Sequence, residues 1–287
     1  MEGSLSDRAG LMKLPVSALA GAAAALGYAA CDRERGTDAL FAGLSVFVLA
    51  AGACTLNNWQ DRFFDIRLER TRRRPLPAKR MPPAQALVQA LLLLGAGLGG
   101  LYSCSPSAGG PLAGLLAVFL YNAAYTPLKK RTLFALVPGV LCGTLPPLIG
   151  WLAAGGAPGA PTVLYLMALF GVWQVPHLWV LLLANIGDER LREQPSLLDH
   201  LSLPQVRRLA VVWAAAFAFL TLYLKVFLLV RGGIPTLLLA ANALALPLVF
   251  ASAFREPWAA ERYRRLSLYL NVSVLGVTLL AAADTLF

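Results

Sequence analysis

Nine long apolar stretches, separated by short polar segments, constrain the fold of this chain more than any other feature of its sequence. Most of them approach the ~20 residues that a helix needs to cross the hydrocarbon core of a bilayer. Hydrophobic residues make up 58% of the 287 residues, and the charged share of 14% is below that of soluble domains. The pattern predicts an all-α integral membrane protein that forms one polytopic domain over residues 1–287. The expected transmembrane helices are 13–30, 38–58, 84–104, 111–126, 132–153, 162–184, 209–230, 234–253 and 266–285.

The chain carries a formal net charge of +10, and its lysines and arginines are unevenly distributed. Of the 25 basic residues, 21 lie in or next to the segments that would share one side of the membrane with the N-terminus. Cytoplasmic loops of membrane proteins carry such an excess of Lys and Arg. We therefore expect the N-terminus in the cytoplasm and the C-terminus outside, in the inner (plasma) membrane. The charge then reflects topology and the lipid bilayer, and it does not indicate nucleic-acid binding.

A ladder of polar residues lies at the expected cytoplasmic end of the second apolar stretch. Asn57, Asp61 and Asp65 recur every fourth residue, and a helix turns about 100° per residue, so their side chains line one face. Mg²⁺ is usually held by one or two carboxylates together with substrate phosphates. Solvated carboxylates at a helix end are the simpler alternative. Acidic groups at membrane depth are costly and usually functional, which favours a site for a metal and a diphosphate.

Basic side chains near this ladder would suit a diphosphate. Arginines follow at positions 70 and 72–74, and the next expected cytoplasmic segment holds Tyr125, Lys129 and Arg131. Some of these cations are topological determinants, but guanidinium groups also bind phosphate oxygens through paired hydrogen bonds.

A second group of polar residues ends a later apolar stretch on the same side. Asn185 and Asp188 follow Asn57 and Asp61 by 128 and 127 residues, which suggests two similar halves. Two carboxylate sites that face each other can hold two Mg²⁺ ions around one diphosphate.

These motifs resemble those of the UbiA superfamily of intramembrane prenyltransferases. The pattern Asn57-x-x-x-Asp61-x-x-x-Asp65 is similar to its first aspartate motif, and Tyr125-x-x-x-Lys129 is similar to its Y-x-x-x-K loop. The resemblance implies nine helices around a central apolar cavity, and Mg²⁺-dependent transfer of a prenyl group from a diphosphate donor to a hydrophobic acceptor. It implies catalytic residues at Asp61, Asp65 and Asp188, which would ligate the metal together with Asn57. The implied substrate-binding residues on the donor side are Asn57, Arg62, Arg70, Arg74, Tyr125, Lys129 and Arg131.

Within the superfamily the resemblance is closest to the haem O synthases. The similar stretches are Asn57-Asn-Trp-x-Asp61-Arg, Leu145-Pro-Pro-Leu-Ile-Gly-Trp151 and Trp173-Gln-x-Pro-His177-x-Trp179. The resemblance implies that a farnesyl group is transferred to a vinyl group of haem B.

The second aspartate motif departs from the family pattern. Glu189 stands in place of a tyrosine, and Arg192 occupies the position of a further aspartate. The sequence leaves open whether Glu189 or Glu193 replaces that carboxylate. An aromatic acceptor, such as a hydroxybenzoate or a naphthoate, is therefore the alternative to haem B.

His177 lies inside an apolar stretch, 11 residues before Asp188. One interpretation is a core histidine that is hydrogen-bonded to a neighbouring helix. The other is a substrate-binding residue that ligates or orients the haem iron, which proteins commonly hold through histidine.

A transporter is a different class of function, but it would place polar groups near the bilayer midplane, where these stretches are apolar. A non-catalytic scaffold would not need the carboxylate ladder.

Overall fold

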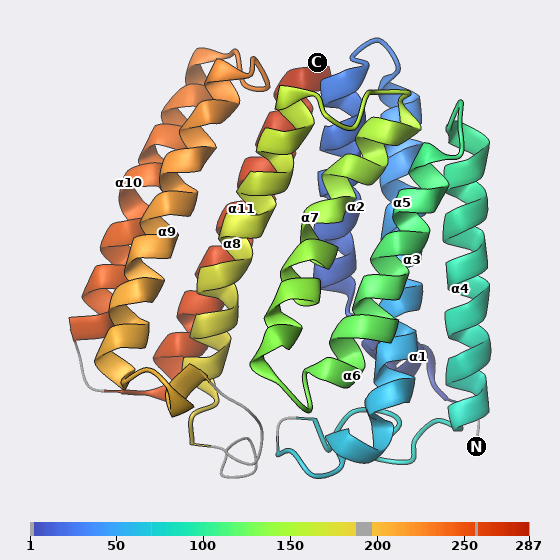
Figure 1. The fold of residues 1–287 in the computed structure, drawn as a ribbon, viewed down its shortest axis with the longest axis vertical. Coiled ribbons are helices and arrows are strands. Elements are labelled where there is room, and N and C mark those ends of the chain that lie inside the picture. The colour runs from blue at the N-terminus through green and yellow to red at the C-terminus, as the bar shows by residue number, and fades with distance from the viewer. Residues whose placement is uncertain (1–2, 70, 188–196, 256–257, 287) are drawn as a thin grey trace.

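The computed structural model describes residues 3–69, 71–187, 197–255 and 258–286, and these residues form a bundle of upright helices (Figure 1). Nine of its helical runs are long and apolar enough to cross a membrane, which confirms the predicted number of spans. They are α2 (Leu14–Cys31), α3 (Gly36–Asp65), α4 (Pro83–Cys104), the combined run Gly109–Leu128, the run Leu133–Ala153 that contains α7 (Leu136–Ala153), α8 (Pro161–Ala184), α9 (Leu203–Val226), α10 (Gly233–Arg255) and α11 (Ala260–Leu286).

Successive helices pack against one another, and α11 returns to contact α2, so the bundle closes into a ring. Because the number of spans is odd, the N- and C-termini lie at opposite ends of the bundle (Figure 1). We call the end that carries the N-terminus the N-side. The described parts of three connections also lie there, namely 66–69, 71–82, 129–132, 185–187 and 197–202.

The backbones of α2 and α7 approach each other very closely. A Cβ atom added at Gly27 would lie 2.0 Å from the carbonyl oxygen of Pro147, and one added at Gly150 would lie 1.8 Å from that of Ala24. No side chain fits into such spaces. Small residues allow helix backbones to approach in this way inside membranes, where van der Waals packing holds helices together. The glycine of the stretch 145–151 thus has a packing role.

Several helices extend beyond the apolar stretches that predict them. Helix α3 continues from the expected end at 58 to Asp65, and α9 begins at Leu203 and not at 209. Ser202 and Gln205 form a capping box at the start of α9, which stabilises a first turn that precedes the apolar core of the helix. Helix α11 likewise starts six residues before the expected 266. Hydropathy locates the part of a helix that lies in lipid and misses its polar ends.

The fourth span contains a π-helix. Helix α5 (Gly109–Val118) passes into a π-helical segment, Phe119–Tyr125, and then into α6 (Thr126–Leu128). The hydroxyl of Thr126 donates a hydrogen bond to the Tyr121 carbonyl, at 2.7 Å. The span therefore continues through Pro127, next to which the sequence predicted its end. Single-turn π-helices occur frequently at functional sites.

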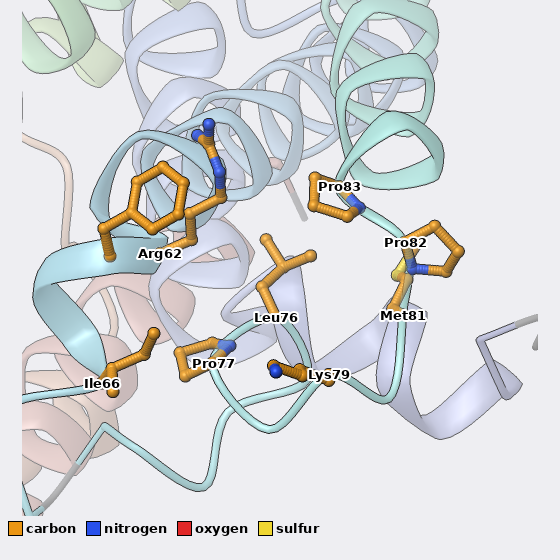
Figure 2. Close-up of a pocket in the computed structure, with 9 residues that line it drawn as sticks. Arg62, Ile66, Leu76, Pro77, Lys79, Met81, Pro82 and Pro83 are labelled. Atoms are coloured by element: carbon orange, nitrogen blue, oxygen red, sulfur yellow. The ribbon is translucent and has the colours of Figure 1, made fainter.

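A short helix that the sequence did not predict, α1 (Leu5–Leu11), precedes the first span. The carboxylate of Asp7, in this helix, forms an ion pair with Arg80 at 2.8 Å. Leu11 packs in a small apolar cluster with Leu76 and Met81. These contacts attach the N-terminal segment to the connection between α3 and α4, which folds back beside the end of α3 (Figure 2).

Candidate active site

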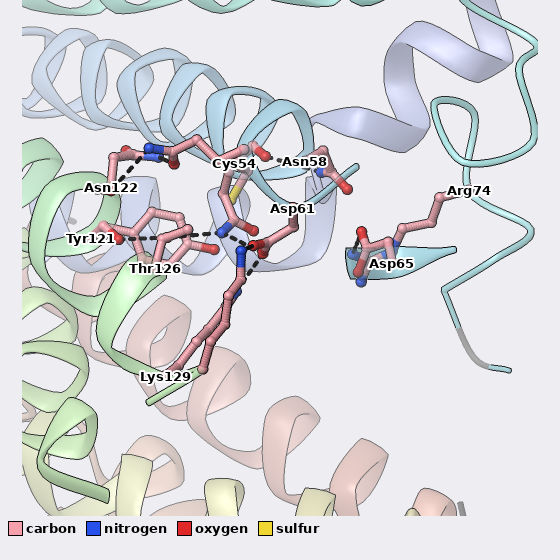
Figure 3. A network of polar contacts seen from close by, with 12 residues as sticks. Cys54, Asn58, Asp61, Asp65, Arg74, Tyr121, Asn122, Thr126 and Lys129 are labelled. Atoms are coloured by element: carbon pink, nitrogen blue, oxygen red, sulfur yellow. Dashed lines mark hydrogen bonds and ion pairs between the residues drawn. The ribbon is translucent and has the colours of Figure 1, made fainter. Parts of the chain in front are cut away.

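The three residues of the predicted ladder lie on the last three turns of α3, at its N-side end (Figure 3). Asn57, Asp61 and Asp65 are only 1%, 3% and 4% exposed. The predicted helical spacing is confirmed, because α3 is continuous from Gly36 to Asp65. Two carboxylates are therefore buried at the edge of a membrane span, where unpaired charges would be very unfavourable.

Both carboxylates are paired with cations from other segments. Asp61 accepts ion pairs on its two oxygens, from Lys129 at 2.5 Å and from Lys130 at 2.7 Å. Asp65 pairs with Arg74 at 2.8 Å. Lys129 and Arg74, which the resemblance assigns to the diphosphate donor, thus lie against the carboxylates of the ladder.

Lys130 is not among the residues assigned to the site from the sequence. Arg131 is assigned there to the diphosphate donor, and the structure shows that Arg131 is exposed. The turn that follows α6 therefore presents Lys129 and Lys130 to Asp61, and it leaves the next residue outside the cluster. Sequence reasoning identified the basic segment but not which of its cations turn inward.

Lys13 is a second residue that the sequence reasoning did not assign to the site. Its ammonium group donates to Asn57 Oδ1 at 2.8 Å and to the hydroxyl of Tyr121 at 3.3 Å. Burial away from water is the main reason that the pKa of Lys13 falls from 10.5 to about 8. The only signal in the sequence is a lysine placed directly before an apolar stretch.

The backbone around Lys13 is held in an unusual conformation. Lys13 lies in the left-handed region, with φ 47° and ψ 55°, at the start of α2. The Asn58 side chain donates to the Leu11 carbonyl at 2.9 Å, and the Ser17 hydroxyl donates to the Met12 carbonyl at 2.8 Å. A non-glycine residue in this region is strained, and such strain often occurs at functional sites.

Asn57 connects the cations to the start of α6, directly after the π-helix. Its amide nitrogen donates to Asp61 Oδ2 at 3.0 Å and to the hydroxyl of Thr126 at 2.9 Å. One amide thus joins α3, the start of α2 and the end of the fourth span. Because every donor and acceptor of this amide is engaged, its orientation is fixed.

Two stacked tyrosines border the cluster on the π-helix. The rings of Tyr121 and Tyr125 lie 5.8 Å apart with an interplanar angle of 12°. Lys129 lies over the Tyr125 ring, 5.4 Å from its centroid. Burial outweighs the attraction of Asp61 and lowers the pKa of Lys129. The π-helix therefore brings aromatic faces to the same place as the cations.

The donor set fits Mg²⁺ in its chemistry. Asn57, Asp61 and Asp65 present amide and carboxylate oxygens from one helix face, the hard ligands that Mg²⁺ prefers. The described residues contain no group of three or more His, Cys, Asp or Glu side chains that are placed to hold a metal. The predicted ligand Asp188 lies outside the described residues, as do Glu189, Arg192, Glu193 and the predicted donor-binding residue Arg70.

Arg62 is not brought to the ladder. Its guanidinium group lies 4.3 Å from the ring centroids of both Trp59 and Phe63 and donates to the Trp59 carbonyl at 2.6 Å. It lines a separate pocket with Lys79. The reason is geometric, because the residue after Asp61 is rotated by about 100° around the helix axis.

His177 lies on α8, two turns before the end of that helix. Its ring stacks on Trp173 with centroids 5.0 Å apart and an interplanar angle of 23°. Asn271 of α11 is its polar neighbour. The His177 Nδ1 and Trp173 Nε1 atoms are buried and have no hydrogen-bond partner among the described residues. A side-chain hydrogen bond to Asn271 fits the interpretation as a core histidine, and the unpartnered Nδ1 atom fits a ligand, so both interpretations retain support.

Comparisons with known proteins agree on one family. The family model described as "UbiA prenyltransferase family" matches residues 15–275. The chain is 34% identical over 280 residues to a protoheme IX farnesyltransferase of Nitratidesulfovibrio vulgaris (strain DP4), covering 95% of this chain and 92% of the relative. It is 37% identical over 242 residues to a protoheme IX farnesyltransferase of Geobacter sulfurreducens, covering 83% and 87%.

Solved structures share the fold. A UbiA homolog from Aeropyrum pernix K1 superposes with a TM-score of 0.72 at 19% identity, over 94% of this chain and 96% of the other. A UbiA homolog from Archaeoglobus fulgidus, bound to GPP and Mg²⁺, superposes with a TM-score of 0.63 at 16% identity, over 95% and 99%.

Proposed function

This chain belongs to the UbiA prenyltransferase family, and we propose that it transfers a farnesyl group from farnesyl diphosphate to a vinyl group of haem B, which yields haem O. The observation that carries the proposal is the buried cluster in which Lys129, Lys130 and Arg74 surround Asp61 and Asp65. The haem acceptor is supported by the two protoheme IX farnesyltransferases, which align with most of the chain.

The charges of the cluster suit a diphosphate that binds together with a metal. Among the described residues, four cations (Lys13, Lys129, Lys130 and Arg74) meet two carboxylates, a net charge of +2. A fully ionised diphosphate ester with one Mg²⁺ has a net charge of −1. When the donor binds, the cations exchange their carboxylate partners for phosphate oxygens, and the carboxylates become available to the metal. Asn57, Asp61 and Asp65 would hold the metal, and Asp188 is a further proposed ligand.

The reaction begins with cleavage of the bond between the allylic carbon and the diphosphate oxygen. The electron pair leaves with the diphosphate, whose developing charge Lys129, Lys130 and Arg74 stabilise through charge-assisted hydrogen bonds. Mg²⁺ held by Asn57, Asp61 and Asp65 would supply additional positive charge to the departing diphosphate. The faces of Tyr121 and Tyr125 offer cation–π stabilisation to the allylic cation.

The acceptor then reacts with the allylic cation. The π electrons of the vinyl group form a carbon–carbon bond to the allylic cation, which leaves a positive charge on the vinyl carbon next to the macrocycle. Water adds to that carbon and releases a proton, so the product carries a hydroxyethylfarnesyl chain. We propose that His177, with its unpartnered Nδ1, ligates or orients the haem iron.

The proposal includes the placement of the protein. The chain is a multi-span membrane protein. We propose that its N-side faces the cytoplasm, that it lies in the inner membrane, and that residues 1–287 form one domain. Cysteines introduced at Arg73 and Ser107, on opposite ends of the bundle, test the orientation. A membrane-impermeant reagent should label only position 107 in intact cells, and labelling of both positions would contradict the topology.

Turnover by the purified protein tests the function. The protein in lipid nanodiscs is incubated with farnesyl diphosphate, haem B and Mg²⁺, and the haem products are identified by mass spectrometry. The expected product is haem O, and its rate of formation should fall by about 10²–10³-fold or more with Asp61→Asn and when no divalent metal is present. A protein that prenylates 4-hydroxybenzoate or a naphthoate but leaves haem B unchanged would overturn the haem assignment in favour of an aromatic acceptor.

A further inference from the structure

A pocket opens on the N-side of the bundle, beside the end of α3, and none of the ladder residues lines it (Figure 2). Its volume is about 460 Å³. The end of α3 contributes Arg62, Phe63 and Ile66, and the connection to α4 contributes Leu76, Lys79 and Met81. The proposed reaction does not use this pocket.

The pocket and the ladder occupy opposite faces of α3. At about 100° per residue, Phe63 and Ile66 are rotated by roughly 200° and 140° from Asp61 around the helix axis. Arg62 turns with them and stacks on the Phe63 and Trp59 rings. A molecule in this pocket therefore lies on a different face of α3 from the cations that surround Asp61.

The walls of the pocket are apolar and open outward. Phe63, in the last turn of α3, is 70% exposed, and Ile66, which directly follows this helix, is 50% exposed. Pro83, which lines the pocket, begins α4, and Val88 and Leu92 farther along this helix are exposed as well. In a membrane-embedded bundle this face contacts acyl chains, so the pocket lies where the apolar surface meets the polar boundary.

Two cations without carboxylate partners accompany these walls. Neither Arg62 nor Lys79 forms an ion pair with any described residue. By contrast, Arg72, Arg74 and Arg80 in the same connection pair with Glu69, Asp65 and Asp7. Lys79 is also held at a positive φ of 55°, a strained conformation for a lysine.

We propose that this pocket binds an anionic phospholipid, with its phosphate against Arg62 and Lys79 and an acyl chain along Phe63 and Ile66. The two unpaired cations complement one phosphodiester charge, and the apolar walls complement the chains. Basic pockets next to membrane spans recognise anionic lipid head groups by this combination. The pocket provides two cations but no carboxylate oxygen for a metal, which separates it from a diphosphate–metal site.

The bound lipid has a structural consequence for the ladder. The connection between α3 and α4 carries Lys79 on the pocket side and Arg74, which pairs with Asp65, on the other. A lipid that joins α3 to Lys79 therefore restricts the segment that positions Arg74. The enzyme should bind its diphosphate donor more tightly in a membrane that contains anionic lipid.

Native mass spectrometry of the delipidated full chain tests the proposal without turnover. Dioleoyl phosphatidylglycerol and dioleoyl phosphatidylcholine are titrated separately against the wild type, Arg62→Gln/Lys79→Gln, and Arg72→Gln/Arg73→Gln. The last variant loses two charges from the same connection but leaves the pocket intact. We expect phosphatidylglycerol to bind the wild type and the control alike, with at least tenfold weaker binding to the pocket variant. Lys79→Gln alone changes only an exposed side chain and should show part of this loss even if the double variant does not fold.

Three results would overturn the proposal. Equal losses in the pocket and control variants would show a general charge effect. Equal retention of the two lipids by the wild type would remove the role of the phosphate charge. Displacement of phosphatidylglycerol by glycerol 3-phosphate or farnesyl diphosphate at equal concentration would show an anion site or a donor site and not a lipid site. None of these readouts depends on which acceptor is prenylated.

Discussion

Replacement of Lys13 by methionine should weaken donor binding, although Lys13 belongs to none of the sequence motifs. The change removes an ammonium group that lies 2.8 Å from Asn57 Oδ1, inside the cluster proposed to bind the diphosphate. A hydrogen bond to a charged group contributes about 1.5–3 kcal/mol, which corresponds to a loss of about 10- to 150-fold in affinity. Methionine has a similar length and no charge, so the packing around the side chain changes little.

The dependence on pH separates this role from a purely structural one. The pKa of Lys13 is lowered to about 8, so the free protein holds its proton at pH 7 and loses it as the pH rises through 8. The anionic donor binds the protonated form more tightly, so wild-type affinity should fall above pH 8, by up to about tenfold per pH unit. Burial also lowers the pKa of Lys129 from its ordinary value. The variant lacks the Lys13 ammonium group, so its affinity should fall less steeply above pH 8 than that of the wild type.

Isothermal titration with a non-hydrolysable farnesyl thiodiphosphate in the presence of Mg²⁺, from pH 6.5 to 9.5, measures both effects. Lys225→Met is the matched control, because Lys225 lies at the opposite end of the bundle and donates to the Arg231 carbonyl. An affinity of Lys13→Met within twofold of the wild type at pH 7, with an unchanged slope, would refute the reasoning and return Lys13 to a structural role.

Three further predictions follow from the site and the packing. Asp61→Asn should lower the rate of prenyl transfer by about 10²–10³-fold or more while the protein still inserts, because it removes a charge from the reacting site; turnover near the wild-type rate would exclude Asp61 as a proposed metal ligand. Lys130→Gln should weaken donor binding at least fivefold, whereas Arg131→Gln, which removes an exposed charge, should leave affinity unchanged; equal effects of the two would contradict the inward placement of Lys130. Gly150→Ala should prevent stable folding in a detergent melting assay, because its Cβ would lie 1.8 Å from a backbone oxygen, whereas Gly95→Ala meets nothing within 4 Å and should be neutral or stabilising by up to about 1 kcal/mol.

The parts of the site that follow from local spacing could be predicted from the sequence. Helical geometry places Asn57, Asp61 and Asp65 on one face, and the structure has them on one buried face of α3. The same geometry places Arg62 elsewhere, although its position directly after Asp61 in the motif favoured its assignment to the donor. Rotation around the helix axis is a better guide to partners than adjacency in sequence.

The remaining parts depend on packing between segments far apart in the chain. Lys13 contacts Asn57 because a hydrogen bond from Asn58 to the Leu11 carbonyl holds the N-terminal segment against α3. The spacing of these residues in the sequence does not predict that contact. The inward turn of Lys130 depends on how the fourth span ends. The π-helix is equally invisible in composition, since its residues would also suit an ordinary α-helix. The assignments of Asp188 and Arg70 remain predictions, because these residues lie outside the described part of the chain.

The π-helix has a consequence for how this site tolerates deletions. A π-helical turn holds one residue more than an α-helical turn, so deletion of one residue from Phe119–Tyr125 lets the fourth span become a regular α-helix with better backbone hydrogen bonds. The shorter chain would then be at least as stable, and the parts of the span on either side of the deletion would keep nearly the same relative orientation, because one π-turn is replaced by one α-turn. Thr126 and Lys129 would still lie near Asn57 and Asp61, and the change would fall on the turn that carries Tyr121 and Tyr125. Such a deletion would therefore separate the contribution of the two stacked tyrosines from that of the cations that follow them.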